Sequence, residues 1–272
     1  MQHYIQTKDA NSDCILFYRL GDFYEMFFED AEIVSKELEL TLTGKSCGLE
    51  ERAPMCGVPY HAAETYLTRL VQRGYKVAVC EQIEDPKEAK GMVKRAVTRI
   101  VTPGTNMDAM SLDESKNNYI MGIFFDGDKY GLSIADVTTA DFFVTEVDSN
   151  RSCLDEINKY GPSEIICNEN FTISGIDIAD LKERMQISIA KLDAHYFDDR
   201  LAVAVLLEHF HTSRLSALGL EEFPMGSISA GALMKYLTEI QKSSLEQFNH
   251  VQPYLNGNFM LLDSSTRRNL EL

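Results

Sequence analysis

Two kinds of hydrophobic pattern meet in the first forty residues. Residues 14–20 form a short apolar run, rich in aromatics, that stops at Gly21, which predicts a buried strand running into a turn. A helix is expected next, because Asp22 is a good N-cap and Glu25 occupies the N3 position of a capping box. Apolar residues then repeat at helical spacing at Tyr24, Phe27, Phe28, Ala31, Val34 and Leu38. Phe23 would lie in the first turn of this helix, with its side chain projecting ahead of the backbone.

The rest of the first hundred residues predicts one more helix and two strands. The helix opens at Pro59 and Tyr60 and ends at Gly74, which suits the C′ position. Residues 75–80 and 96–101 are apolar and β-branched, so strands are expected there. A Thr-Pro-Gly-Thr segment then interrupts the pattern.

A polar segment without periodicity, residues 103–118, separates this region from a second one and is the best candidate for a linker. Three strands joined by short turns follow and predict an antiparallel meander, at residues 119–125, 130–137 and 141–147. The elements expected after the meander are a helix through Leu154 and Ile157, a strand at 164–167, and helices near 199–210 and 229–241. The second region is therefore an α/β unit.

Composition places the chain among globular proteins with two domains, since it has 272 residues, 44% hydrophobic and 25% charged. No apolar run approaches the roughly 18 to 20 residues of a membrane span, and the first residues lack the features of a signal peptide, so a cytoplasmic location is expected. The six cysteines form no C-x-x-C pair and are interpreted as reduced packing residues. His195, His209 and His211 lack ligand-like partners, so no metal site is expected.

The formal net charge of −16 argues against a general nucleic-acid binder, because affinity for DNA depends on neutralising phosphates. The acid is concentrated in the second region: residues 1–110 hold 13 Lys and Arg against 17 Asp and Glu, and the remaining residues hold 13 against 25. Within the first region, the stretch from Lys87 to Arg99 carries five basic residues and only one acid. A local basic stripe is thus present in an acidic chain.

The segment from Gly21 to Glu25, Gly-Asp-Phe-Tyr-Glu, resembles the G-x-F-Y-E motif of the MutS family. Further blocks resemble the same family and occur in its order, namely Pro54 to Ala62, Cys80-Glu81-Gln82, Arg99 to Thr105 and Asp263 to Leu270. The resemblance covers nearly the whole chain and is strongest in residues 15–105 and 259–272.

The resemblance implies an α/β fold in two parts: a mixed-sheet mismatch-binding domain at residues 1–105 and a ribonuclease H-like connector domain at 118–252. Residues 106–117 would link them, and residues 253–272 would begin the truncated core or lever domain. In the whole family protein it implies a homodimer on mismatched double-stranded DNA, a MutL partner at the connector, and an ATPase that uses ATP and magnesium. The motifs of that ATPase do not occur in this sequence. The chain is therefore expected to be a monomeric fragment without enzymatic activity or a bound cofactor.

The resemblance also assigns site residues. Phe23 would act as a wedge in the base stack and Glu25 would hydrogen-bond the displaced base, a costly place for an anion beside phosphates. Lys45 and Arg95 align with phosphate-contacting positions, and Lys94 and Arg99 are further candidates. From spacing alone, Glu25 is half of a capping box, Phe23 an ordinary aromatic, and the basic residues solvated surface charges.

Two alternatives to mismatch recognition remain open from the sequence. A metal-dependent, structure-selective nuclease would need converging carboxylates, and Asp126, Asp128, Asp136 and Asp141 are its candidates, although the first two lie in a tight turn where aspartate is common. The chain could instead act only as a protein-interaction module. The Gly44-Lys45-Ser46 triplet does not predict ATP binding, because Glu39 stands where a Walker A motif needs glycine.

Overall fold

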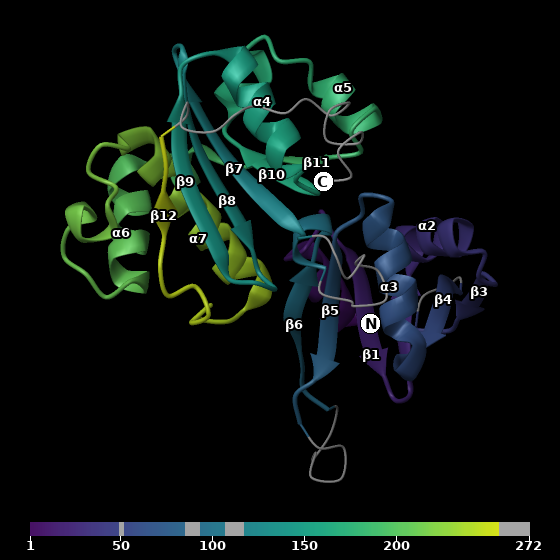
Figure 1. Ribbon diagram of the computed structural model, residues 1–272. Coiled ribbons are helices and arrows are strands. Elements are labelled where there is room, and N and C mark those ends of the chain that lie inside the picture. Colours follow the sequence, from purple (N-terminus) through teal and green to yellow (C-terminus); the bar gives the residue numbers. More distant parts are fainter. Residues whose placement is uncertain (49–51, 85–92, 107–116, 256–272) are drawn as a thin grey trace. The chain divides into compact units, whose positions relative to one another are not determined.

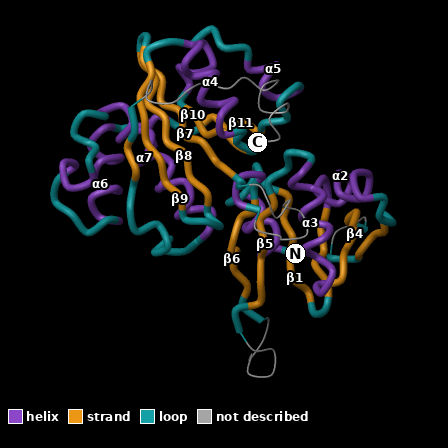
Figure 2. Tube along the Cα trace, in the orientation of Figure 1, coloured by secondary structure: helices purple, strands orange, loops and turns teal. Residues whose placement is uncertain are grey.

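The computed structural model describes residues 1–48, 52–84, 93–106 and 117–255. They form two compact units, and each unit contains one six-stranded mixed sheet with helices beside it (Figures 1 and 2). The expected mixed α/β fold class is confirmed. The linker expected at 106–117 and the start of a further domain expected at 253–272 fall almost entirely outside the described residues.

The sheet of the first unit has the strand order β3-β4-β2-β1-β5-β6. Its strands are β1 (Ile15–Leu20), β2 (Phe23–Phe27), β3 (Thr43–Lys45), β4 (Ala53–Pro59), β5 (Val77–Gln82) and β6 (Arg95–Val101). Strands β1 and β5 pair in parallel, and the other neighbours are antiparallel. The strands expected at 14–20, 75–80 and 96–101 are therefore confirmed, with small shifts at their ends.

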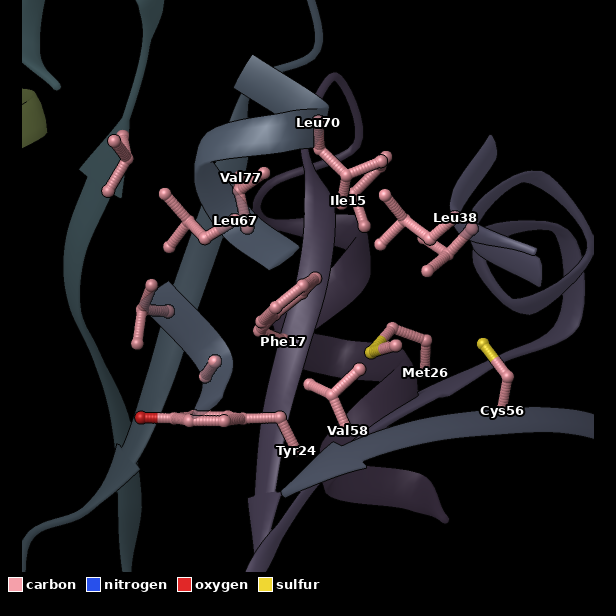
Figure 3. Close-up of a cluster of buried hydrophobic side chains, with 14 of the residues drawn as sticks. Ile15, Phe17, Tyr24, Met26, Leu38, Cys56, Val58, Leu67, Leu70 and Val77 are labelled. Atoms are coloured by element: carbon pink, nitrogen blue, oxygen red, sulfur yellow. The ribbon is translucent and has the colours of Figure 1, made fainter. Parts of the chain in front are cut away.

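Helices cover both faces of this sheet. Helices α2 (Phe28–Leu38) and α3 (Ala63–Gln72) pack on one face, where a buried cluster includes Phe17, Met26, Val58 and Leu67 (Figure 3). The expected second helix is thus confirmed: a short 3-10 turn η1 (Tyr60–Ala62) precedes α3, and Gly74 follows with a φ of +87°. Helix α1 (Gln2–Asp9) packs on the other face through Tyr4, against Leu16, Tyr18 and Phe27.

A buried carboxylate fastens α1 to the sheet. Asp30 of α2 is 3% exposed and accepts hydrogen bonds from the Leu16 amide at 3.0 Å and the Tyr4 hydroxyl at 3.4 Å. It also forms an ion pair with Lys8 Nζ at 2.9 Å. Burial and the neighbouring Asp30 charge raise the pKa of Tyr4, so its hydroxyl stays protonated and can donate.

We expect Asp30→Asn to lower the free energy of unfolding by about 1.5 kcal/mol, because the amide cannot accept from all three donors and loses the charge that pairs with Lys8. Urea unfolding followed by circular dichroism measures this loss. Glu32→Ala on the exposed side of the same helix is the control and should change stability by at most about 0.5 kcal/mol. Equal effects of the two substitutions would contradict a role for Asp30 in holding α1.

The prediction of a helix that begins at Asp22 is wrong. Residues Phe23 to Phe27 form β2, which folds back on β1 through a turn at Gly21 with a φ of +60°, and α2 begins only at Phe28. The run Phe-Tyr-Glu-Met-Phe satisfies a period of two, since Tyr24 and Met26 face one core while Phe27 faces the other. Asp22 and Glu25 therefore do not form a capping box.

The second unit has the strand order β11-β10-β7-β8-β9-β12. Strands β7 (Tyr119–Asp126), β8 (Lys129–Asp136) and β9 (Asp141–Val147) form the expected antiparallel meander. Strands β10 (Glu164–Cys167) and β11 (Ser188–Lys191) join it in parallel on one side, and β12 (Gln252–Pro253) pairs in parallel with β9 on the other. A meander extended by parallel strands agrees with the expected ribonuclease H-like arrangement.

Helices also cover both faces of the second sheet (Figure 1). Helices α4 (Asn150–Tyr160) and α5 (Ile178–Glu183) contribute to the core on one face, with the 3-10 segment η3 (Glu169–Ile173). Helices α6 (Asp199–His209) and α7 (Pro224–Gln241) lie on the other face, near where the sequence predicted them. Short 3-10 segments η2 (Pro103–Thr105), η4 (Ala194–Phe197) and η5 (Leu215–Leu218) complete the described elements.

The start of α7 approaches β8 very closely. A Cβ added at Gly131 of β8 would lie 2.1 Å from the backbone oxygen of Met225, and one at Gly231 would lie 2.2 Å from the backbone oxygen of Ala202 in α6. The backbone of α7 is thus in direct contact with β8 at Gly131 and with α6 at Gly231, with no space for a side chain at either glycine.

Candidate functional site

The hairpin of β1 and β2 presents Phe23 to solvent. Phe23 is the first residue of β2, pairs with Leu20 across the Gly21-Asp22 turn, and is 48% exposed. Side chains alternate along a strand, so Phe23, Glu25 and Phe27 share the face on which α1 packs. Helix α1 contacts this face at Phe27 and Tyr18, and Phe23 lies beyond these contacts, at the turn end of the hairpin.

Glu25 lies two residues from Phe23 on the same face and forms an ion pair with Lys45. Its Oε2 is 2.5 Å from Lys45 Nζ, and the side chains of Glu25 and Lys45 are 16% and 42% exposed. The ammonium group is also 5.7 Å from the centre of the Phe27 ring. The partly buried carboxylate thus has its charge balanced within the protein, and Lys45 is close enough to the face to meet a ligand there.

Arg95 lies on the same face at the start of β6. Its backbone pairs with Gln82, its Nε donates to the Arg19 carbonyl at 2.8 Å, and its Nη1 donates to the Val93 carbonyl at 2.7 Å. The guanidinium is 5.5 Å from the centre of the Tyr18 ring, which sits beside Glu25 in the sheet. Burial raises the pKa of Tyr18, and the Arg95 charge opposes that rise. The expected phosphate-contacting arginine is therefore held in place by the strands around it.

The structure does not bring Arg99 to this group. The register between β5 and β6 shifts between Val79 and Cys80, so Arg99 lies opposite Val79, which faces the core beneath α2 and α3. Arg99 forms an ion pair with Glu64 of α3 on that face. Lys94 is exposed just before β6, and its backbone amide donates to Glu84 at 3.1 Å. Lys87 and Lys90 of the basic stretch lie outside the described residues.

Sequence reasoning gave no role to Arg19, Tyr60 and Glu81, which meet beside the same hairpin turn. The Arg19 guanidinium lies 4.0 Å from the centre of the Tyr60 ring and 3.8 Å from a Glu81 oxygen. Tyr60 is 48% exposed. These residues come from three separate segments. Tyr60 and Glu81 lie in the blocks Pro54 to Ala62 and Cys80-Glu81-Gln82 that resemble the MutS family, but no local pattern indicated that the two meet at Arg19.

The carboxylates considered for a nuclease do not gather into a metal site. Among the described residues, no three His, Cys, Asp or Glu side chains are placed to hold a metal ion. Asp136 is buried and accepts hydrogen bonds from the amides of Asn118 and Thr138, so it organises the turn after β8. His209 contacts the Phe248 carbonyl at 2.8 Å. Within the residues that the structure describes, none of the helices has the length and apolar character needed to span a membrane.

Comparison with protein families gives two matches. Residues 1–110 match the family model described as MutS domain I, and residues 118–252 match the model described as MutS domain II. Together the two models account for nearly the whole chain.

Curated relatives match along the full 272 residues. The chain is 58% identical to the DNA mismatch repair protein MutS of Lachnoclostridium phytofermentans, covering 100% of this chain and 29% of that protein. It is 48% identical to the DNA mismatch repair protein MutS of Ruminiclostridium cellulolyticum and 46% identical to that of Acetivibrio thermocellus, covering 100% of this chain and 31% of each. The chain thus spans less than a third of the length of these relatives.

Proposed function

The chain belongs to the MutS family, and from this premise we propose that it recognises mismatched or unpaired bases in duplex DNA by inserting Phe23 into the base stack. The observation that carries the proposal is the position of Phe23, an exposed ring at the turn of a hairpin, two residues from a carboxylate on the same face. The named relatives are DNA mismatch repair proteins, which supports the same role here.

The discrimination follows from the cost of deforming DNA. Opening a base step costs a few kcal/mol, and stacking of a base on an aromatic ring returns about 1 to 3 kcal/mol. A mispaired or unpaired base is cheaper to unstack than a paired one. The ring therefore tests mechanical weakness rather than a fixed sequence.

Glu25 and Lys45 have different polar roles in the proposed site. We assign Glu25 to a hydrogen bond with the displaced base, while Lys45, Arg95 and, more peripherally, Lys94 contact phosphates. The ion pair between Glu25 and Lys45 lowers the repulsion that an unpaired carboxylate would present to DNA. On a perfect duplex the carboxylate gains no base partner, so its presence disfavours matched DNA. Arg99, on the other face, is not assigned to this site.

The remaining roles concern the whole protein. We propose that residues 1–105 are the mismatch-binding domain and 118–252 the connector, and that MutL contacts the connector. In the whole protein we propose a homodimer and an ATPase that uses ATP and magnesium. Most of the dimer interface and the ATPase would lie in parts of the relatives that this chain does not cover. We also propose a cytoplasmic location for the protein. With a net charge of −16, the 272-residue chain should bind DNA weakly, as a monomer and with steep salt dependence.

A titration of labelled duplexes tests the proposed function. Fluorescence anisotropy at low salt is expected to show tighter binding to a duplex with one mismatch than to its matched counterpart. Equal affinities would contradict mismatch recognition, and no binding to either duplex would favour the role of a protein-interaction module. Cleavage products after incubation with magnesium would favour the nuclease.

Lys45→Gln should weaken binding to matched and mismatched duplexes by similar factors and reduce the slope of log K against log salt by about 1, since a phosphate contact carries no base information. Anisotropy titrations at several salt concentrations measure both quantities. The control is Lys36→Gln on α2, which packs against the other face of the sheet and should leave the slope unchanged. A selective loss of mismatched binding would show instead that Lys45 acts at the base.

A further inference from the structure

The side of the β1 and β2 turn opposite Phe23 carries a compact group of side chains around Arg19. Arg19 lies directly across from Tyr24 in the hairpin and points to the face covered by α2 and α3. Its Nε donates to the carbonyl of Gly21 in the turn itself, and its guanidinium stacks 4.0 Å from the Tyr60 ring centre. Its side chain is 17% exposed, so these contacts occupy most of its surface.

Tyr60, the first residue of η1 directly after β4, contacts the same turn. Its backbone amide donates to the Asp22 carbonyl at 2.9 Å, and the preceding Pro59 pairs with Phe23. Both carbonyls of the two-residue turn, Gly21 and Asp22, are thus bonded within the protein. The two donors, Arg19 and Tyr60, are themselves in contact through the stacked guanidinium and ring.

Glu81 of β5 holds Arg19 in this position. One Glu81 oxygen lies 3.8 Å from Arg19 Nη1, and the other accepts a hydrogen bond from the Tyr24 hydroxyl. Burial, followed by the hydrogen bond to Glu81, raises the pKa of Tyr24, so the hydroxyl remains a donor. Figure 3 shows Tyr24 at the border of the buried cluster, with its hydroxyl directed away from Met26 and Cys56.

We propose that Arg19, fixed between Gly21, Tyr60 and Glu81, is a positioning residue that stiffens the hairpin turn and thereby sets mismatch specificity. The inference rests on the proposed wedge function of Phe23. A wedge discriminates between weak and strong base steps only if the duplex yields before the wedge does. A turn free to bend would let Phe23 retreat from every duplex alike, and the preference for mismatches would fall.

Amide hydrogen exchange in the DNA-free chain tests the stiffening directly. Arg19→Met removes the turn hydrogen bond, the stack on Tyr60 and the ion pair, and should accelerate exchange of the amides of residues 20–24 by about tenfold. The matched control is Arg73→Met, since Arg73 likewise bonds one carbonyl and one carboxylate, both of Glu37. It should leave the turn unchanged. Unaltered exchange in Arg19→Met would overturn the proposal.

A second pair of variants tests the proposal independently, in case Arg19→Met fails to fold. Tyr60→Phe keeps the ring on which Arg19 stacks, whereas Tyr60→Ala removes it from a half-exposed position. Only the alanine variant should speed exchange in the turn and lower the ratio of mismatched to matched affinity. Equal behaviour of the two variants would contradict the proposal.

Phe23→Ala, titrated in parallel, separates the two claims. If it abolishes the mismatch preference while Arg19→Met and Tyr60→Ala retain it, Arg19 has no role in specificity although the wedge stands. If Phe23→Ala itself retains the preference, the wedge function is wrong.

Discussion

Phe23→Ala is expected to reduce the preference for a mismatched over a matched duplex by roughly tenfold or more. The substitution removes the stacking of the ring on a base, which is worth about 1 to 3 kcal/mol. Binding to the matched duplex should change little, since the ring gains least where the base stays stacked. The measurement is the ratio of the two dissociation constants at one salt concentration.

The fold should tolerate this change, because the Phe23 ring is 48% exposed and contributes little to the core. Leu42→Ala is a matched control, since Leu42 is a similarly exposed apolar residue of the same unit, at 46%. It should alter neither the ratio nor the melting temperature. A preserved preference in Phe23→Ala, with normal folding, would remove the main support for the wedge.

Gly131→Ala is expected to destabilise the second unit by about 3 kcal/mol. The new methyl group would lie 2.1 Å from the Met225 carbonyl oxygen and 2.7 Å from the Gly226 amide nitrogen, both backbone atoms at the start of α7. Neither can swing aside as a side chain would, so α7 must shift away from β8. Thermal and urea unfolding measure the loss.

Gly127→Asn provides the comparison within the same unit. Gly127 has a φ of +69° in the turn before β8, and an added Cβ there would meet nothing within 4 Å. Asparagine tolerates this conformation, so stability should change by less than about 1 kcal/mol. If Gly131→Ala proved as mild as Gly127→Asn, the close contact with α7 would not be a constraint on the sequence.

Elements whose hydrophobic residues fit only one spacing, that of a strand or that of a helix, could be predicted from the sequence. Segments that fit both spacings could not. The meander of β7 to β9 and the helix ending near Gly74 each have a single hydrophobic pattern bounded by turn residues. The segment Phe23 to Phe27 fits both a strand and a helix, because every position except Glu25 is aromatic or apolar. Tertiary pairing with β1 and β4 decides in favour of the strand.

The site itself was predicted only in part, for reasons of register and long-range contact. Arg95 and Arg99 are four residues apart and would share a face of a regular strand. The register shift between Val79 and Cys80 places Arg95 and Arg99 on opposite faces of the sheet. No local sequence pattern in β6 predicts this shift. The pairing of Glu25 with Lys45 likewise joins residues 20 positions apart. The wedge role that the motif assigns to Phe23 stays a prediction, whereas the helix expected around this residue was wrong.

Strand β2 lies inside its sheet, between β1 and β4, and this limits how the hairpin can grip a nucleic acid. The main-chain amides and carbonyls along an inner strand are used by its neighbours, so none is left to add a strand or to hold a sugar-phosphate backbone. Whatever β2 contributes to a bound duplex must come from alternate side chains, chiefly Phe23 and Glu25. Under the proposed function, base preference at this position can therefore evolve by single substitutions that leave the sheet intact.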